Sequence, residues 1–376
     1  MRKDWEYKKL GEVCDILDSQ RKPVTKKDRK KGIYPYYGAT GIQDFVDNYI
    51  FDGRYVLVGE DGAKWSANEK CAYIIEGKTW INNHAHVLST KNMVIDSFLT
   101  YYLNFSDLDS YISGAIIRKL TQSSLKSIPI PLPPKPTQLA IVAELDKINE
   151  LIQLKKQQLK DYDQLAQSIF YEMFGDPVEN EKGWEVKKLG EISTIERGSG
   201  ISKKDFCSAG LPCIHYGQIH TSFGAYTKEV LSFIPENLLP KYKYASRGDL
   251  VMAITSEDVE GSCKSTTWLG NYDVVIGSDA AICHHSQDGI YLSYYTRTKA
   301  FYNEKAKYAK GFKVTHISTK EIASIPIPLP PLPLQQQFAA RIEAIEQQKQ
   351  QVKDAIKDLE TLLASRMQYW FDFTPD

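Results

Sequence analysis

Two long stretches of the chain repeat apolar residues in alternating steps of four and three positions. The first runs from Ile141 to Met173, and the second runs from Phe338 to Trp370. A heptad seam kept over about five heptads predicts coiled-coil helices. A helix of about 38 residues is roughly 57 Å long, which exceeds the width of a small domain. We therefore predict that the two helices bury their seams on each other. The seam residues expected at this contact are Ile141, Leu145, Ile148, Ile152, Leu159, Ile345, Val352, Ile356, Leu359 and Leu363.

A proline-spaced segment precedes each helix. The eight residues SIPIPLPP occur at 127–134 and again at 324–331. Alternating proline excludes a central strand because proline has no N–H for the ladder, and the residue before each proline stays extended. Pro136 and Pro333 cannot continue a helix backward. We therefore expect each segment, here called a proline ramp, to be a stiff spacer between a folded segment and a long helix.

A second repeat sets the domain organisation. WEYKKLGEV begins at Trp5 and WEVKKLGEI begins at Trp184, with seven of nine residues identical. The chain therefore consists of a folded segment, a ramp and a helix, in that order, twice. The predicted parts are a first domain at 1–126, a ramp with helix and linker at 127–183, a second domain at 184–323, and a ramp with helix at 324–376.

The short linker between the halves predicts the direction of the helices. Residues 175–183 can span at most about 30 Å, so the second domain lies at the far end of the first helix. To bury its seam, the second helix must run back along the first. The pair is then antiparallel, and the repeat acquires a pseudo-two-fold axis like that of an isologous dimer.

The two folded segments are similar in sequence at their two ends but differ between them. Short β-rich runs at 55–60, 72–77, 86–90, 249–255 and 274–283 predict strands, and one aromatic-rich helix is expected in each segment, at 97–105 and 292–303. The predicted fold class is α/β (α+β), with two mixed, mainly β domains separated by a long antiparallel two-helix coiled coil. Different interiors on one frame indicate two different binding surfaces.

Charge is unremarkable overall and uneven locally. The 47 basic and 47 acidic side chains cancel, yet RKPVTKKDRKK (21–31) is dense in lysine and arginine and is followed by tyrosines and polar residues. A charge run is often only a solvated loop. Here it also fits a loop that grips phosphates beside a surface that reads bases. The candidate DNA-binding residues are Arg21, Lys22, Lys26, Lys27, Arg29, Lys30, Tyr36, Tyr37, Thr40, Gln43, Asn83, His84, Arg118, Lys119, Lys203, Lys204, His215, Tyr216, Gln218, Lys313 and His316.

The motifs of catalysis and metal binding are missing from the sequence. There is no phosphate-binding GxxxxGK[ST] loop, and His84 with His86 lacks further ligands at zinc spacing. Glu185 and Lys187 resemble part of a nuclease site, but Glu6 and Lys8 repeat them, which assigns them to the domain edge. No apolar run suits a membrane helix, and six unpatterned cysteines suit a reducing compartment. We expect a cytoplasmic, non-catalytic protein without a metal or cofactor of its own.

The paired WE-x-KKLGE openings, the twin IPIPLPP ramps, the two long helices and the dissimilar interiors together resemble the specificity subunit of type I restriction–modification systems. The resemblance covers nearly the whole chain. It implies two target recognition domains that read a bipartite DNA target. It also implies two modification (methyltransferase) subunits that use S-adenosylmethionine, and restriction subunits that use ATP and Mg.

Three other functions remain open from the residues alone. A reader for a type II-like methyltransferase–nuclease would share the architecture and differ only in its partner. A coiled-coil scaffold with two protein-binding ends would lack DNA affinity at low salt. An independent nuclease is disfavoured by the missing acid pairs.

Overall fold

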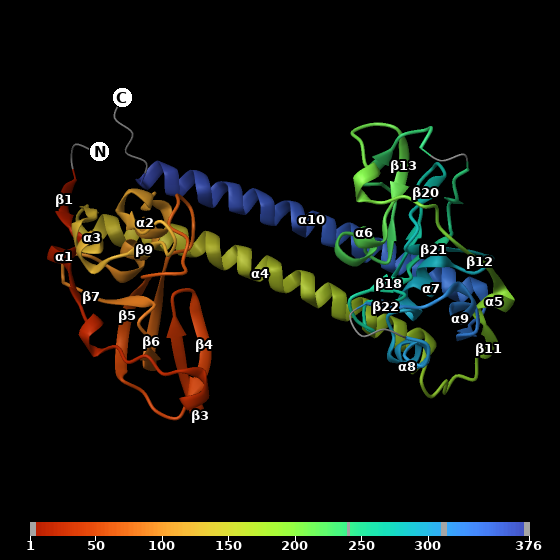
Figure 1. Cartoon of the computed structure of the whole chain (residues 1–376), viewed down its shortest axis with the longest axis horizontal. Coiled ribbons are helices and arrows are strands. Elements are labelled where there is room, and N and C mark those ends of the chain that lie inside the picture. Colours follow the sequence, from red (N-terminus) through yellow and green to blue (C-terminus); the bar gives the residue numbers. More distant parts are fainter. Residues whose placement is uncertain (1–4, 239–240, 310–313, 372–376) are drawn as a thin grey trace. The chain divides into compact units, whose positions relative to one another are not determined.

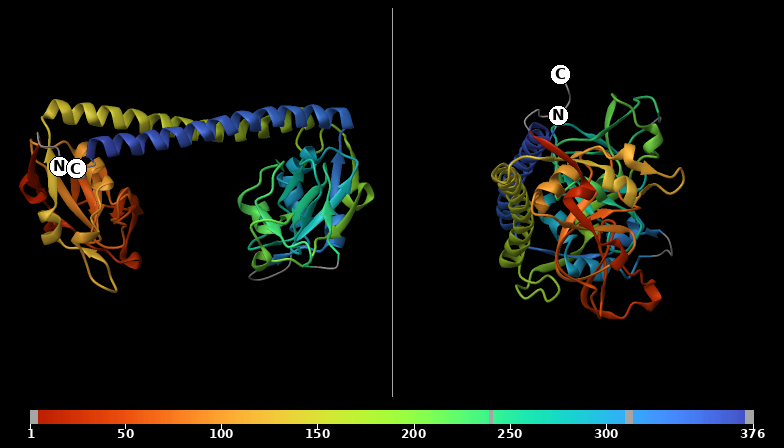
Figure 2. Two further views of the ribbon diagram at one scale, coloured as in Figure 1. Left: turned by 90° about the horizontal axis from the view of Figure 1, so that it is seen from above. Right: turned by 90° about the vertical axis from the view of Figure 1, so that its left-hand side faces the viewer.

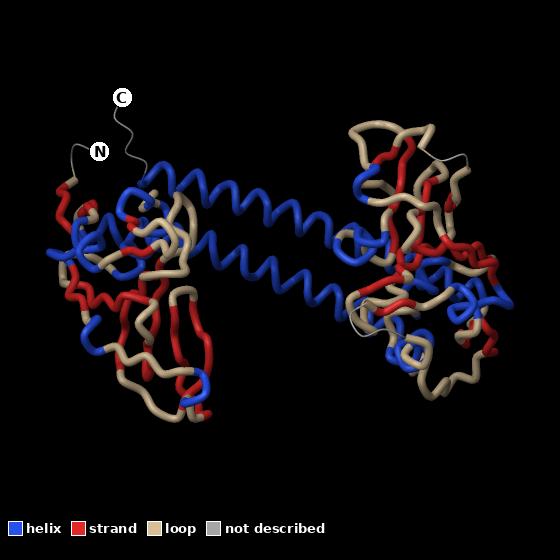
Figure 3. Tube along the Cα trace, in the orientation of Figure 1, coloured by secondary structure: helices blue, strands red, loops and turns tan. Residues whose placement is uncertain are grey.

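The computed structural model describes residues 5–238, 241–309 and 314–371. Two compact units make up the chain. Unit 1 comprises Met1–Gln157 with Lys353–Asp376, and unit 2 comprises Gln158–Val352. Both combine helices with mainly antiparallel sheets (Figures 1 and 3), which confirms the mixed α+β class. Among the described residues, no helix is long and apolar enough to cross a bilayer.

The folded part of unit 1 is a six-stranded sheet in the order β2-β7-β5-β6-β3-β4. Neighbouring strands are antiparallel except for β3 and β6, which run parallel. Val56 and Val58 of β5 enter one core cluster and Leu57 enters another, so the central strand is buried on both faces. The elements are α1 (Leu10–Val13), β2 (Cys14–Ile16), β3 (Lys31–Gly38), β4 (Gly41–Val46), β5 (Phe51–Gly59), β6 (Ala72–Ile81), β7 (Ala85–Thr90), α2 (Asp96–Phe105), β8 (Ile112–Ser113), β9 (Lys119–Leu120) and α3 (Gln122–Ser127), with short 3₁₀ turns at Asp18–Gln20, Lys26–Asp28 and Asp109–Tyr111.

Unit 2 has a different interior. A five-stranded sheet in the order β12-β21-β17-β19-β14 accompanies a four-stranded sheet in the order β15-β13-β20-β16 and the pair β18-β22. The elements are α5 (Leu189–Ile192), β12 (Ser193–Arg197), β13 (Leu211–Ile214), α6 (Tyr216–Thr221), β14 (Tyr226–Thr227), β15 (Ser232–Ile234), β16 (Tyr244–Ala245), β17 (Leu250–Ala253), β18 (Thr255–Ser256), β19 (Ser265–Trp268), β20 (Val274–Ile276), β21 (Ala280–His285), α7 (Gly289–Tyr295), α8 (Lys299–Lys305), β22 (Thr315–His316) and α9 (Thr319–Ala323), with a 3₁₀ turn at Lys203–Asp205.

Three predicted elements of unit 2 are each divided in two, and the first is the expected strand at 249–255, which is β17 followed by the start of β18. The expected helix at 292–303 is α7 followed by α8, because Thr298 caps the second helix by accepting from the Phe301 N–H and so starts a new one. The expected strand at 274–283 is β20 and β21, which belong to different sheets. A Gly-Ser-Asp turn at 277–279 separates them, as Gly and Asp in such a run often indicate.

Each proline ramp is a strand paired with the repeated opening that precedes its domain. β1 (Glu6–Lys9) pairs antiparallel with β10 (Pro129–Leu132), and β11 (Glu185–Lys188) pairs with β23 (Pro326–Leu329) in the same register. The ramps are extended and are not central strands, as predicted, but their pairing with the repeated openings was not anticipated. Two-stranded pairing leaves one edge of each ramp free, which tolerates prolines that cannot donate. The two sequence repeats thus form one frame, and each half of the chain contains a copy.

The two long helices, α4 (Lys135–Phe174) and α10 (Leu332–Phe371), each contain 40 residues. In unit 1, the Trp370 indole N–H donates to Glu144 at 3.0 Å. In unit 2, Lys349 pairs with Asp163 at 2.8 Å. The contact on α10 moves from Trp370 back to Lys349 as the contact on α4 moves from Glu144 on to Asp163, which confirms the antiparallel pairing (Figure 1).

The residues of the predicted seam are largely removed from solvent. Every seam residue named above is buried except three that are half-buried, namely Leu159, Leu359 and Leu363. The ends of the seam continue into the domain cores. Phe338 packs against Phe170 and Phe174 in unit 2, and Phe371 packs against α2 of unit 1.

A buried glutamine joins each long helix to its own domain. Gln138 and Gln335 occupy the same place after their ramps, and both are fully buried. The Gln138 side chain accepts from the Ile95 N–H and donates to the Met93 and Pro133 carbonyls. Gln335 accepts from the Asp288 N–H and donates to the Pro330 carbonyl and to Gln287. Each glutamine thereby fixes the start of its helix against the folded part of its unit, which lies to one side of the helices (Figure 2).

Candidate nucleic-acid interface

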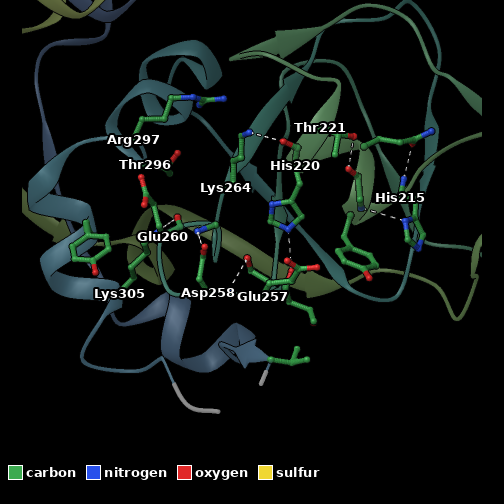
Figure 4. Close-up of a pocket in the computed structure, with 18 of the residues that line it drawn as sticks. His215, His220, Thr221, Glu257, Asp258, Glu260, Lys264, Thr296, Arg297 and Lys305 are labelled. Atoms are coloured by element: carbon green, nitrogen blue, oxygen red, sulfur yellow. Dashed lines mark hydrogen bonds between the residues drawn. The ribbon is translucent and has the colours of Figure 1, made fainter. Parts of the chain in front are cut away.

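Unit 2 contains an open cavity of about 1270 Å³, shown in Figure 4. Its walls come from the 3₁₀ turn at Lys203–Asp205, helix α6, the loop that follows β18, and the segment from Thr296 into α8. Five lysine and arginine side chains and three acidic ones line it, so the lining is net positive. The charged residues are Lys203, Glu257, Asp258, Glu260, Lys264, Arg297, Lys299 and Lys305.

Hydrogen bonds fix one wall of the cavity. The His220 Nε2–H donates to the Thr255 carbonyl at 3.0 Å, and the Lys264 Nζ donates to the His220 carbonyl at 2.7 Å. Burial lowers the pKa of Lys264, and the nearby Arg297 guanidinium lowers it further. Arg297 itself donates to the carbonyls of Ser265 and Gly224, which holds it in the wall.

Some candidate residues of unit 2 are fixed by hydrogen bonds within the domain, and others have exposed side chains. His215 is only 5 % exposed, and its Nδ1 accepts from the Gly217 N–H, so it caps α6 from the core. Burial lowers its pKa, and Lys203 adds to the effect. The Gln218 amide accepts from the His215 N–H and donates to Ser232. These bonds give His215 and Gln218 local structural roles, and both residues also line the cavity, so their contact with DNA stays a prediction.

The remaining candidates of unit 2 stay predictions. Lys203 and Lys204 are exposed, Tyr216 is half-buried beside His215, and His316 is exposed with its Nδ1 3.2 Å from Thr255 Oγ1. Lys313 lies outside the described residues. Lys203, His215, Tyr216 and Gln218 line the cavity, so the structure brings part of the predicted set together there.

In unit 1, some basic side chains of the run 21–31 are exposed, and others contact the protein itself. Lys22, Lys26, Lys27 and Lys30 are exposed. Arg29 instead lies over the Tyr36 ring at 4.2 Å and pairs with Asp44 at 3.3 Å. Tyr36 is 1 % exposed, and its hydroxyl bonds to the Val24 backbone. Tyr36 is therefore a core residue that anchors the basic loop, not the surface contact expected from the sequence.

A buried charge network lies beneath the loops of unit 1. Arg21 pairs with Glu60 at 2.5 Å and with Asp18 at 3.5 Å, and Lys119 pairs with Glu60 at 2.7 Å. His86 places Nδ1 2.6 Å from Asp18 and Nε2 2.8 Å from the Leu120 carbonyl. Arg21, with a side chain only 12 % exposed, is thus held by protein carboxylates inside the network, whereas the Lys119 side chain is 45 % exposed and stays a predicted phosphate contact.

The same network contains three groups that could in principle hold a metal ion. Ligand atoms of Asp18, Glu60 and His86 lie within 4.8 Å of one another. Arg21 already pairs with both carboxylates, and Lys119 adds a second cation to Glu60. We therefore interpret the group as an ion-pair network that supports the loops above it.

Exposed polar residues gather above this network. His84 pairs with Asp61 at 2.6 Å, Asn83 is exposed, and Arg118 pairs with Asp109 at 2.6 Å. Of the other candidates of this unit, Thr40 and Gln43 are exposed, whereas Tyr37 is half-buried and packs against the core cluster that contains Leu57. Gln43 accepts from the buried Asn82 at 3.3 Å. These residues remain candidate base contacts.

The network predicts that unit 1 loses stability in acid. Burial raises the pKa of Asp18, but hydrogen bonding to His86 and the charges of His86 and Arg21 outweigh it, so the pKa lies below its ordinary 3.8. The pKa of Glu60 is likewise lowered from 4.5 by Lys119 and Arg21 against the effect of burial. Groups with depressed folded-state pKa values stabilise above their unfolded values and lose that contribution as pH falls through the folded ones.

Urea unfolding between pH 6 and 2 measures this contribution. We expect the unfolding free energy of unit 1 to fall below about pH 4.5, and Asp18→Asn to make that fall shallower. Asp47→Asn, at an exposed aspartate, is the matched control and should keep the wild-type slope. Equal slopes in all three proteins would contradict the role assigned to Asp18.

Sequence reasoning missed the acidic loop at 257–260 and Lys264, Lys299 and Lys305. They lie on the connection between β18 and β19 and on α8, and only folding brings these two segments to one cavity. The run Glu257-Asp258-Val259-Glu260 was the one local indication, and an isolated acidic run usually indicates only a solvated loop.

Comparison with known proteins agrees with this architecture. The type I restriction modification DNA specificity domain matches residues 2–161 and again 181–360. A Haemophilus influenzae protein, provisionally assigned as a type I restriction enzyme specificity subunit, is 27% identical over 347 residues, covering 91% of this chain and 87% of its own. The type I restriction enzyme MjaVIII specificity subunit of Methanocaldococcus jannaschii is 24% identical over 393 residues, covering 96% and 92%.

Solved structures share the fold. The S subunit of the type I restriction–modification system from M. genitalium aligns with a TM-score of 0.59 at 14% identity, covering 99% of this chain and 96% of that one. A chain from a study of complex assembly in a type I system aligns with a TM-score of 0.56 at 20% identity, covering 99% and 98%. With both halves matched by the same domain, the chain belongs to the type I restriction modification DNA specificity family.

Proposed function

We propose that the chain is the DNA sequence-recognition subunit of a type I restriction–modification complex and reads a bipartite, asymmetric target. One observation carries this proposal. The same frame of opening strand, ramp strand and buried glutamine occurs twice, whereas the folded parts on it differ, with a six-stranded sheet in unit 1 and two smaller sheets in unit 2. Two domains held by the same frame but with different folded parts would present different surfaces, and such surfaces suit two different half-sites of DNA.

The antiparallel helix pair supports a specific geometry for the target. Two readers related by a pseudo-two-fold axis meet half-sites of opposite orientation on one duplex. In the proposal, the long helices set the separation of the half-sites. A helix of 40 residues would be about 60 Å long, so the gap between half-sites stays within about 17 base pairs.

The chemistry of modification and cleavage belongs, in this proposal, to partner subunits. Two modification subunits would supply S-adenosylmethionine-dependent methylation, one for each half of the repeat, and restriction subunits would supply ATP- and Mg-dependent cleavage. This chain contributes DNA binding and placement and acts without catalysis of its own. A type II-like methyltransferase–nuclease partner is the alternative assembly, and the neighbouring genes distinguish the two.

Methylome sequencing tests the proposal directly. A strain with the gene should methylate a motif of two short, unlike half-sites separated by a fixed gap, and a strain without it should lose that motif alone. An uninterrupted motif, or no change in methylation, would contradict the proposed function.

The exposed lysines of the basic loop are expected to bind phosphate. Replacing Lys26, Lys27 and Lys30 with alanine should weaken binding to specific and nonspecific duplexes alike, because phosphate contacts carry no sequence information. Each lost contact should reduce the slope of log K against log salt by about 0.9. Binding isotherms of the assembled complex between 50 and 300 mM salt measure the effect.

The matched control neutralises three exposed lysines on the long helices, Lys160, Lys353 and Lys357. It makes the same change in net charge, and it should leave the salt slope unchanged. If the loop variant changed base preference instead of the slope, these lysines would be readers and not anchors.

A further inference from the structure

Two acidic side chains of the cavity in unit 2, Glu257 and Glu260, have no hydrogen bond or ion pair of their carboxylates among the described residues, and only the backbone of Glu260 is held, by Lys305. Glu257 is exposed. The carboxylate of its neighbour Asp258 already has a partner within the loop, because it accepts a hydrogen bond from the Gly261 N–H at 2.6 Å. Figure 4 shows Glu257, Asp258 and Glu260 along one side of the cavity.

The loop that presents Glu257 is held from below. Lys305 is 3 % exposed, and its Nζ donates to the Glu260 and Ser262 carbonyls at 2.7 and 2.5 Å. The Ser262 hydroxyl donates to the Val259 carbonyl at 2.7 Å. A buried ammonium under the loop fixes the backbone on both sides of residue 261, so Glu257 stands on a preorganised support.

Gly261 is required for this close packing. A Cβ at this position would lie 2.3 Å from the Ser256 hydroxyl and 3.2 Å from Asp258 Oδ1. The loop therefore closes tightly on itself. Preorganisation of this kind reduces the ordering that binding would otherwise require.

Free cations on other elements of the cavity complement the acid. Lys203 and Lys299 are exposed, and no side-chain hydrogen bond or ion pair of either is found in the described part of the chain. Lysine at the edge of a cavity suits the phosphates of a duplex. An ionised carboxylate can only accept hydrogen bonds, and the amino groups at the major-groove base edges, cytosine N4 and adenine N6, are donors.

We propose that Glu257 is a specificity-determining residue that accepts a hydrogen bond from the exocyclic amino group of one cytosine or adenine in the half-site read by unit 2. The proposal rests on the proposed function. Lys203 and Lys299 hold the flanking phosphates, and Lys305 is a positioning residue that supports the loop and does not touch DNA.

The test begins with the target of the wild-type complex, taken from methylome sequencing. Glu257→Ala is then compared with wild type and with Glu229→Gln, at an exposed glutamate outside the cavity. We expect Glu257→Ala to relax one base pair of the unit 2 half-site and to leave the other half-site and the gap unchanged. Glu229→Gln should keep the wild-type motif.

Base analogues identify the atom that is read. In duplexes bound by the purified complexes, each cytosine or adenine of that half-site, other than the methylated adenine, is replaced in turn by a base without the exocyclic amino group. At one position, wild type should bind about 5- to 150-fold more weakly, whereas Glu257→Ala should show little further loss.

The outcomes separate the two proposals. A wild-type complex without a bipartite motif defeats the proposed function. A normal wild-type motif that Glu257→Ala leaves unchanged overturns this inference alone. An equal loss of binding on all sequences, or equal sensitivity of both proteins to every analogue, also overturns it.

Discussion

Removal of one heptad from each long helix is expected to abolish methylation of the wild-type target. Deleting residues 152–158 and 354–360 keeps both apolar seams in phase, since seven residues restore the heptad position. The antiparallel pairing on either side of the deletions is also kept. Each helix becomes about 10 Å shorter, which corresponds to about three base pairs of duplex. The half-sites would then no longer meet both domains at the original gap.

Methylome sequencing of the deletion strain measures this result. We expect methylation of the original motif to fall at least about 100-fold, because losing one half-site forfeits several base contacts at about 1–3 kcal/mol each. Any new motif should combine the same half-sites with a smaller gap. A control with Gln153→Ala and Lys357→Ala, both exposed, keeps the helix lengths and should keep the motif. Retention of the original gap by the deletion variant would end the proposal that the helices set it.

The helices were predictable because their pattern is local. Seam residues such as Leu145 and Ile342 recur within one stretch of chain, and the structure buries both. The ramps were not predictable in the same way. Pro129 pairs with Lys9 across about 120 residues, and no property of SIPIPLPP alone names that partner. The repeat of both segments was nevertheless an available indication, because two segments repeated together can be two sides of one contact.

In the candidate site, the sequence likewise shows which residues are charged but does not show which of them form ion pairs within the protein. The sequence indicates that Arg21, Lys26 and Lys119 carry charge, but whether that charge faces solvent depends on distant residues. Glu60 lies 39 residues from Arg21 and binds it, while Lys26 is left exposed. Aromatic residues behave likewise, since Tyr36 lies in the core. A basic run therefore predicts the region of an interface better than it predicts the individual contacts.

Loss of either buried glutamine is expected to destabilise its own unit strongly. Gln335→Leu would leave the Asp288 N–H and the Pro330 carbonyl without their partner. An unsatisfied buried group costs about 1–3 kcal/mol, so we expect a loss of about 3 kcal/mol or more in the free energy of unfolding. Gln138→Leu should act equally on unit 1, because the Ile95 N–H and the Met93 and Pro133 carbonyls lose theirs.

Urea unfolding of the full chain tests both variants, with Gln337→Leu as the matched control. Gln337 is exposed on the same helix, so the identical substitution there should change stability by less than about 0.5 kcal/mol. Gln335→Glu is a sharper probe, because a carboxylate would face the Pro330 carbonyl as a second acceptor, and it should destabilise at least as much as leucine. If Gln335→Leu unfolded like the control, the three hydrogen bonds of Gln335 would not be what holds the helix to its domain. Placement of the second reader would then depend on the apolar contacts of Phe338 with Phe170 and Phe174.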